Sequence, residues 1–151
     1  MDGKIKNRSP MHCITEIKIR GYHLDFYSHV NNARYLEFLE EGRWEFFSDF
    51  LNTGLHKQVD WQLVIVNINI NFRGPVKLGD TLVVETDLKE ISKKSFTLTQ
   101  KCILKGNDAV AADALVKMVA VDQKLQKAVI VDEEIKQIIF GNRLTNRVYA
   151  L

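Results

Sequence analysis

The sequence predicts an α+β domain in which an antiparallel sheet packs against one long helix. Two observations support this class: residues 62–121 alternate like strands between short turns, and residues 31–51 carry apolar side chains at helical spacing. A chain of 151 residues has the size of one domain and can bury a core of its own. We therefore expect residues 1–151 to form a single domain, with residues 1–10 as a loose tail.

The first part of the chain reads as a strand, a loop and the long helix. Residues 13–20 alternate apolar and polar side chains, whereas residues 21–30 have no steady period. Either Asn31 or Asn32 can cap the helix, because an asparagine oxygen accepts a hydrogen bond from a free N–H of the first turn. The sequence Asn-Thr-Gly at 52–54 predicts where the helix stops.

The long helix has a broad apolar stripe, which predicts deep burial. The members of this stripe are Tyr35, Leu39, Gly42, Phe46 and Phe50. A glycine inside a helix costs up to ~1 kcal/mol relative to alanine. We therefore expect another backbone to approach the helix closely at Gly42.

Four strands and a short helix complete the chain. We expect the strands at residues 62–71, 81–91, 95–105 and 109–121, separated by turn sequences rich in Gly, Pro, Asn and Asp. Short turns predict an antiparallel meander, with the long helix buried against one face. Asp132 is the expected cap of the last helix and Gly141 its end.

The second face of the strand at 62–71 is mixed. One face is predicted to carry Val64, Val66, Ile68 and Ile70, and the other Asn67, Asn69 and Asn71. Apolar residues on both faces of several strands are compatible with burial between subunits.

Composition excludes several functions. A net charge of +2 does not predict nucleic acid as a partner. Cys13 and Cys102 are expected to be buried free thiols, since two distant cysteines make no disulfide framework. No apolar run approaches the ~20 residues of a membrane span, and residues 1–10 have no signal core. We expect a soluble, cytoplasmic protein.

An acid, a histidine and two asparagines precede the long helix. The pattern D-x-x-x-H-V-N-N-A-R-Y-L-E at residues 25–37 resembles the signature of hotdog-fold acyl-thioesterases. It is similar to the 4-hydroxybenzoyl-CoA thioesterase-like group and to acyl-ACP thioesterases, and GPVKLGDTL at 74–82 resembles that group's strand connection. The resemblance covers residues 13–121. It implies a sheet wrapped around a central helix, and a homodimer or homotetramer with sites at the subunit seam.

The resemblance implies an acyl-CoA thioesterase that releases a free acid and CoA. Such a reaction needs a nucleophile and a donor for the carbonyl oxygen, because the thiol, with a pKa near ~8.5, leaves readily. Asp25 is the implied nucleophile or general base, and these routes stay open. The backbone N–H of Asn32 is implied to polarise the carbonyl at the positive helix end. His29 could orient water, bind the substrate or steady the loop.

Further residues are candidates for binding the substrate. Asn31 and Tyr35 lie beside the implied catalytic residues, although Tyr35 and Trp44 are better explained by core packing. The family is implied to grip the CoA nucleotide at a strand connection, here at Lys93, Lys94 and Ser95. Other basic candidates are Arg73, Lys77, Arg143 and Arg147. The resemblance also implies that a helix glutamate, here Glu40 or Glu41, could act as the base toward a partner subunit's site, although solvated helix charges are the better expectation.

Other functions stay open beside acyl-CoA hydrolysis. The substrate could be acyl-ACP, and the chain could be a non-catalytic acyl-ligand binder. A hotdog hydratase or dehydratase is the other enzymatic alternative, and the sequence HVNNARY argues against it. The chain contains no GxxxxGK[ST], GxGxxG, HExxH, CxxC or GxSxG pattern. We therefore expect no metal and no cofactor beyond the CoA or phosphopantetheine of the substrate.

Overall fold

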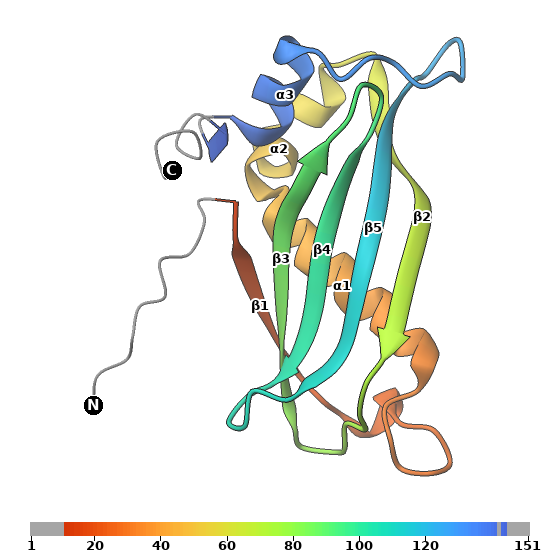
Figure 1. Cartoon of the computed structure of the whole chain (residues 1–151), viewed down its shortest axis with the longest axis vertical. Helices are drawn as coiled ribbons and strands as arrows, with labels where there is room; N and C mark the ends of the chain where they lie inside the picture. Colours follow the sequence, from red (N-terminus) through yellow and green to blue (C-terminus); the bar gives the residue numbers. More distant parts are fainter. Residues whose placement is uncertain (1–10, 142, 145–151) are drawn as a thin grey trace, which may run out of the picture.

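The computed structural model describes residues 11–141 and 143–144; the predicted tail and Arg147 lie outside the described residues. The predicted strand, long helix, four strands and short helix are all present (Figure 1). In chain order the elements are β1 (Cys13–Lys18), η1 (Gly21–His23), α1 (Asn32–Phe46), α2 (Ser48–Asn52), η2 (Leu55–Lys57), β2 (Trp61–Phe72), β3 (Thr81–Ile91), β4 (Phe96–Leu104), β5 (Val110–Asp122) and α3 (Glu133–Phe140). Within the described ranges, no helix is long and apolar enough to cross a membrane.

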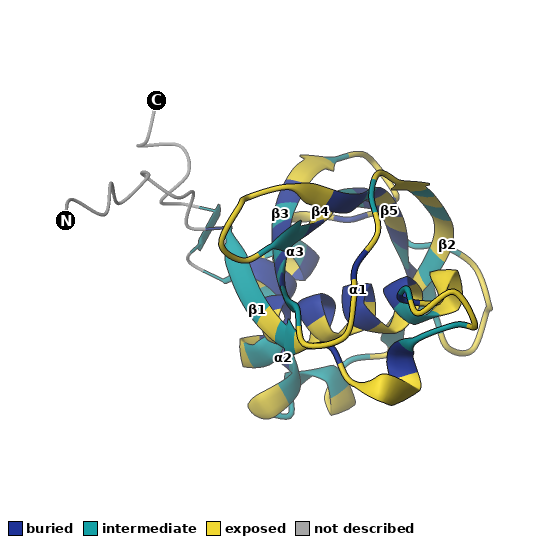
Figure 2. Cartoon of the chain, turned by 90° about the horizontal axis from the view of Figure 1, so that it is seen from below, coloured by how far each residue is buried: buried dark blue, intermediate teal, exposed yellow. Residues whose placement is uncertain are grey.

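One antiparallel sheet, with strand order β1-β3-β4-β5-β2, curves around α1 (Figures 1 and 2). Successive residues of β3, β4 and β5 alternate between buried and less buried positions. The buried side chains of these strands face α1 and form a single core with it. The predicted α+β class is confirmed.

The predicted meander is right for β3, β4 and β5 but wrong for β2. β2 pairs with β5 at one edge of the sheet, whereas β1 occupies the side of β3 that a meander would have given to β2. Residues 73–80 therefore cross the end of the sheet from the edge strand β2 to β3, which lies next to the opposite edge. This connection is longer than a typical hairpin loop, which has about two to five residues.

The predicted face assignment within β2 is wrong for Val64 and Val66, which are both exposed. The register with β5 shifts between Ile65 and Asn67, so Val66 is an extra residue in β2. Such a bulge changes the phase of the alternation. Ile68 beyond the bulge packs on the core, while Val66 is 53% exposed at the edge of the sheet.

The predicted apolar stripe is buried along α1 and into α2. α1 ends at Phe46, earlier than predicted, and Phe50 belongs to α2. The expected close approach at Gly42 is present, but its neighbours are side chains and not a backbone. A Cβ at Gly42 would lie 2.8 Å from Thr86 Oγ1 and 2.9 Å from Gln100 Nε2. The glycine thus lets α1 sit directly on the sheet.

The cap of α3 and the two cysteines were also predicted from the sequence. Asp132 caps α3 by accepting a hydrogen bond from the Ile135 N–H at 2.9 Å, as expected. Both cysteines are free; Cys102 is buried as predicted, whereas Cys13 is only half-buried. Burial raises the pKa of the Cys102 thiol to about 12, so this thiol is protonated and packs as an apolar group.

Candidate active site

The loop between η1 and α1 is held in one conformation by its own backbone. The Asp25 N–H donates to the His29 carbonyl at 2.8 Å, and the Ser28 N–H donates to the Asp25 carbonyl at 3.0 Å. Ser28 adopts a left-handed conformation with φ of 61°, which closes the turn. The loop is also tied to the β2–β3 connection, because the Val30 N–H donates to the Val76 carbonyl at 2.9 Å.

The Asp25 carboxylate is fixed by two backbone N–H groups. Its Oδ1 accepts hydrogen bonds from the Tyr27 N–H at 2.9 Å and from the His29 N–H at 3.3 Å. No side-chain partner of Oδ2 is found among the described residues. The carboxylate is therefore held at one oxygen while the other stays available, and a carboxylate must be presented in this way to act as a nucleophile or base.

The start of α1 follows directly after this loop. Asn31, and not Asn32, is the cap: its Oδ1 accepts from the Ala33 N–H at 3.0 Å, and its backbone is extended. Asn32 is the first helical residue and is exposed. Within the described part of the chain its backbone N–H has no acceptor. The structure thus has a free amide at the positive end of α1, a few residues after Asp25.

His23 is a residue of this region that the sequence did not single out. It is buried, and its Nδ1 accepts a hydrogen bond from the Arg20 N–H at 2.9 Å. Its carbonyl accepts from the Asn31 N–H at 2.9 Å, and its ring packs edge-on against Phe38 at 5.1 Å. His23 therefore sets the position of the helix cap. A lone histidine in a loop without period carries no sequence signal for such a role.

The predicted substrate-binding residues are spread over both ends of the molecule. Tyr35 is a core residue between Phe38 and Phe72, and burial raises its pKa to about 12. Arg73 lies beyond the end of β2 and donates from Nε to Asp113 at 2.8 Å. Lys77 is exposed and its backbone bridges to His29, which places it beside the Asp25 loop.

The predicted nucleotide-binding residues are not near Asp25 in the same chain. Lys93 and Lys94 are exposed in the β3–β4 turn, and Ser95 is buried. That turn lies at the opposite end of the sheet from the Asp25 loop (Figure 1). Arg143 packs its guanidinium over the Phe46 ring at 4.9 Å.

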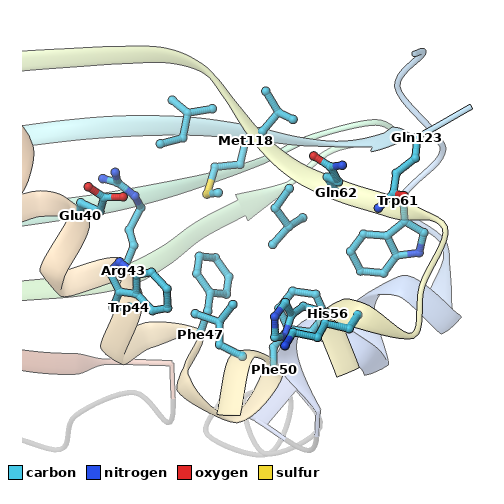
Figure 3. Close-up of a pocket in the computed structure, with 15 residues that line it drawn as sticks. Glu40, Arg43, Trp44, Phe47, Phe50, His56, Trp61, Gln62, Met118 and Gln123 are labelled. Atoms are coloured by element: carbon cyan, nitrogen blue, oxygen red, sulfur yellow. The ribbon is translucent and has the colours of Figure 1, made fainter. Parts of the chain in front are cut away.

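A pocket of about 850 Å³ opens along the second half of α1 (Figure 3). Most of its walls are aromatic or aliphatic side chains from α1, α2 and the start of β2, including Trp44, Phe47 and Trp61. Trp44 is exposed into this space, so core packing was the wrong expectation for it. Glu40 also lines the pocket and is exposed, and Glu41 is exposed as predicted.

A curved sheet around one helix, with an acid placed at the start of that helix, defines a hotdog-fold protein. The model of the thioesterase-like superfamily matches residues 19–139. The chain therefore belongs to the thioesterase-like superfamily, as the pattern at residues 25–37 indicated.

Individual relatives agree with this membership. The long-chain acyl-CoA thioesterase FadM of Escherichia coli is 45% identical over 123 residues, which cover 82% of this chain and 93% of FadM. The acyl-CoA thioesterase YbgC of Haemophilus influenzae is 30% identical over 109 residues, which cover 71% of this chain and 79% of YbgC. The crystal structure of YbaW, a probable thioesterase from Escherichia coli, matches with a TM-score of 0.77 and 44% identity, covering 83% of this chain and 94% of YbaW.

Proposed function

We propose that Asp25 and the Asn32 amide hydrolyse an acyl-CoA thioester in this protein. The protein is an acyl-CoA thioesterase, the class to which FadM and YbgC belong by name. One observation carries the assignment of the site: a carboxylate with one free oxygen stands in the loop that leads directly to an unpaired amide at the start of α1.

Each half of the site supplies one requirement of the reaction. The Asn32 N–H, backed by the positive end of α1, would stabilise the negative charge that develops on the thioester carbonyl oxygen. Asp25 would either attack the carbonyl carbon, forming a mixed anhydride, or take a proton from an attacking water. In both routes the carbon–sulfur bond breaks and the CoA thiolate leaves. In the first route, water then hydrolyses the anhydride, which releases the free acid and restores the Asp25 carboxylate. His29, Asn31 and the basic residues remain candidates for binding, and their roles stay predictions.

The acyl chain is proposed to be long. FadM acts on long-chain acyl-CoA by name. The pocket of about 850 Å³ along α1 has mainly apolar walls, so it offers room and burial for an extended hydrocarbon chain. Burial stabilises a bound chain by about 0.8 kcal/mol per CH₂ group.

Release of thiol from tetradecanoyl-CoA by wild type and Asp25→Asn tests the catalytic assignment. Asparagine keeps the shape and an acceptor oxygen, so folding should survive, while kcat/KM should fall by at least ~100-fold. Asp60→Asn is the control, because it makes the same change at an exposed aspartate just before β2, away from the Asp25 loop. Equal turnover by wild type and Asp25→Asn would remove Asp25 from the mechanism.

The same assay addresses the alternatives. Binding of acyl-CoA without release of thiol by the wild type would favour a non-catalytic binder. Faster turnover of acyl-ACP than of acyl-CoA would favour the carrier protein as the natural substrate. Hydration of an enoyl-CoA without thiol release would favour a hydratase.

A homodimer through β2 is part of the proposal. β2 is an edge strand, and Val64 and Val66 are exposed beside the polar face formed by Asn67, Asn69 and Asn71. Such an edge can pair with a second copy. An antiparallel pair would bring the distant β3–β4 turn of one subunit toward the partner's Asp25 loop, which would reconcile Lys93 with a role in binding. Sedimentation of wild type and Val66→Lys tests the homodimer. The wild type should be a dimer and the variant a monomer, and a monomeric wild type would contradict the proposal.

The cytoplasmic location stays a prediction from the sequence.

A further inference from the structure

One face of α1 leads from the free amide to the pocket. Asn32, Leu36, Glu40, Arg43 and Phe47 are spaced by four, four, three and four residues, so they follow the same side of the helix. Leu36 is 45% exposed, which leaves an uncovered apolar surface between Asn32 and the pocket. Arg43 and Phe47 line the pocket itself. A chain whose carbonyl lies at the Asn32 amide can therefore run along this face into the pocket.

Arg43 is a buried cation in this mainly apolar wall. It is only 9% exposed, and burial lowers the pKa of its guanidinium. Its one hydrogen bond to a side chain runs from Nη1 to Gln100 Oε1 at 3.0 Å. Among the described residues it forms no ion pair. A guanidinium carries five N–H groups, so most of the donors of Arg43 remain for a ligand.

The side-chain amide of Gln100, the partner of Arg43, already uses both its nitrogen and its oxygen in hydrogen bonds. Gln100 Nε2 donates to the Leu39 carbonyl and to Thr86 Oγ1, both at 2.9 Å, and Gln100 Oε1 accepts from Arg43. The glutamine thus holds the guanidinium in place and has no further group to offer it. The other guanidinium nitrogens of Arg43 are not buried without a partner, so a ligand in the pocket can reach them.

A second buried polar atom lies in the same pocket. His56 lines the pocket, and its Nδ1 is buried without a hydrogen-bond partner in the described structure. In Figure 3, Arg43 stands on the α1 side of the pocket, whereas His56 and Trp61 stand at the other end. A pocket made only for a hydrocarbon chain would need neither polar group.

We propose that the pocket binds the far part of an acyl chain that carries a neutral oxygen, such as a hydroxyl or keto group, and that Arg43 donates a hydrogen bond to that oxygen. This inference rests on the proposed function, because it places the carbonyl at Asn32. A carboxylate at the same position is disfavoured, since the Glu40 carboxylate lines the same wall one turn before Arg43. The site therefore selects an oxygenated acyl chain over both a plain chain and a diacid.

Helix geometry indicates where on the chain the oxygen lies. Arg43 follows Asn32 by eleven residues, which corresponds to about 16 Å along the helix at ~1.5 Å per residue. A zigzag chain of ~1.5 Å bonds advances about 1.25 Å per carbon. About thirteen such steps from the carbonyl carbon place the oxygen near the fourteenth carbon, within about three carbons on either side.

The experiment compares three CoA thioesters of equal length: tetradecanoyl, ω-hydroxytetradecanoyl and tetradecanedioyl. Wild type should show a kcat/KM at least ~10-fold higher for the hydroxylated chain than for the plain chain, the lower end of what a hydrogen bond to a charged group contributes. The diacid should be the poorest substrate. A ratio of hydroxylated to plain chain near one in the wild type would overturn the proposal.

Arg43→Met removes the donors and keeps an apolar side chain of similar length. The preference for the hydroxylated chain should then disappear while the plain chain is still hydrolysed. Lys117→Met, which removes an exposed cation on β5, is the control and should keep the preference. A loss of activity that is equal for both chains in Arg43→Met would assign Arg43 to structure alone and overturn the proposal.

Two further measurements keep the outcome decisive. If Arg43→Met does not fold, Arg43→Lys is the substitute. Lysine keeps the charge but lacks the fork of donors that can bind Gln100 and the ligand together. The ratio of kcat/KM for the hydroxylated chain to that for the plain chain should therefore fall toward one. An unchanged preference in a folded Arg43→Lys would contradict the role of the fork. If the wild type releases thiol from none of the three thioesters, the proposed function itself has failed. This outcome differs from a failure of the Arg43 contact, in which thiol is released at equal rates from the plain and the hydroxylated chain.

Discussion

His23 and Asn31 are joined by a backbone hydrogen bond of 2.9 Å, from the Asn31 amide to the His23 carbonyl. The His23 ring is fixed in turn, because its Nδ1 accepts from the Arg20 N–H at 2.9 Å. The residue that caps α1 is therefore anchored to a buried imidazole. An acceptor at Nδ1 requires that this nitrogen carry no proton, so the geometry needs the neutral histidine.

Acidification is expected to destabilise the fold through His23. Burial, followed by the positive charge of Arg34, lowers the pKa of His23 below its ordinary value of 6.5. A group with a lowered folded pKa contributes stability above its unfolded pKa and loses it as the pH falls through the folded pKa. The free energy of unfolding of the wild type should thus decrease as the pH falls from about 8 to about 5, the range in which histidine titrates.

Urea titrations across that pH range compare wild type with His23→Gln, which lacks the titrating ring but keeps an acceptor. The variant should be less stable at neutral pH and should lose less stability on acidification. Since His12, His29 and His56 are present in both proteins, the difference between the two pH slopes reports His23. Parallel slopes would show that His23 does not titrate below its ordinary value.

Gly42→Ala is expected to destabilise the protein although alanine is the better helix former. The added Cβ would lie 2.8 Å from Thr86 Oγ1 and from Val84 Cγ1, which is closer than real contacts allow. Overpacking a well-packed core typically costs about 1–3 kcal/mol, more than the gain of up to ~1 kcal/mol in helix propensity. We expect a net loss of up to about 2 kcal/mol when the full gain in helix propensity is subtracted from the cost of overpacking.

Thermal unfolding of Gly42→Ala measures this balance directly. Gly54→Ala tests the other use of glycine in the chain, because Gly54 has space around it but a φ of 77°. Both variants should lower the melting temperature, one through contact and the other through backbone strain. A Gly42→Ala protein more stable than the wild type would show that the sheet can move away from α1.

The elements were predictable because each depends on neighbours in sequence. The capping asparagines, the alternation in β3 and the spacing of Tyr35 and Leu39 are local signals, and the structure agrees with them. The bulge at Val66 was not predictable from the apolar pattern, since residues 63–66 are all apolar and fit either phase of the alternation. The pairing of β2 with β5 depends on which edge β1 occupies, and no local pattern carries that information.

The candidate site was predictable in part for the same reason. Asp25, Asn31 and Asn32 lie within one short segment, so a motif can describe them together. The role of His23 depends on a hydrogen bond back to Arg20 and on packing against Phe38. Arg43 reaches its partner Gln100 across 57 positions of sequence, and an arginine within a helix would ordinarily be expected at the surface.

Asn31→Ala should cost both stability and activity. The variant removes the acceptor that binds the Ala33 N–H at 3.0 Å, and loss of a cap typically costs about 0.5–2 kcal/mol. The first turn of α1 would then be free to fray, which misplaces the Asn32 amide. A displacement of about 1 Å can lower the rate by up to ~100-fold, so we expect a fall in kcat/KM of ~10–100-fold.

Asp132→Ala is the matched control for this loss. Asp132 also caps a helix with its side-chain oxygen, which accepts from the Ile135 N–H at 2.9 Å, and α3 lies at the other end of the molecule from Asp25 (Figure 1). The two variants should lose similar stability, but only Asn31→Ala should lose thiol release. A parallel loss of activity in both would mean that general destabilisation, and not the position of the amide, explains the effect.

A proline at position 32 separates the backbone amide from every other property of the residue. Proline removes the N–H but is well tolerated as the first residue of a helix, where that N–H has no intrahelical acceptor. The preceding residue must be extended, and Asn31 already is, with φ −61° and ψ 135°. Asn32→Ala is the matched control, since it removes the side chain and keeps the amide.

Asn32→Ala should hydrolyse tetradecanoyl-CoA within a few-fold of the wild type. Asn32→Pro should fold with a similar melting temperature but lose about 100–1,000-fold in kcat, the usual effect of deleting one donor to an oxyanion. This loss requires that the positive end of α1 act on the carbonyl oxygen through the Asn32 N–H. Comparable rates in the two variants would mean that the carbonyl oxygen is stabilised elsewhere, and the assignment of Asn32 would have to be abandoned even if Asp25 proved essential.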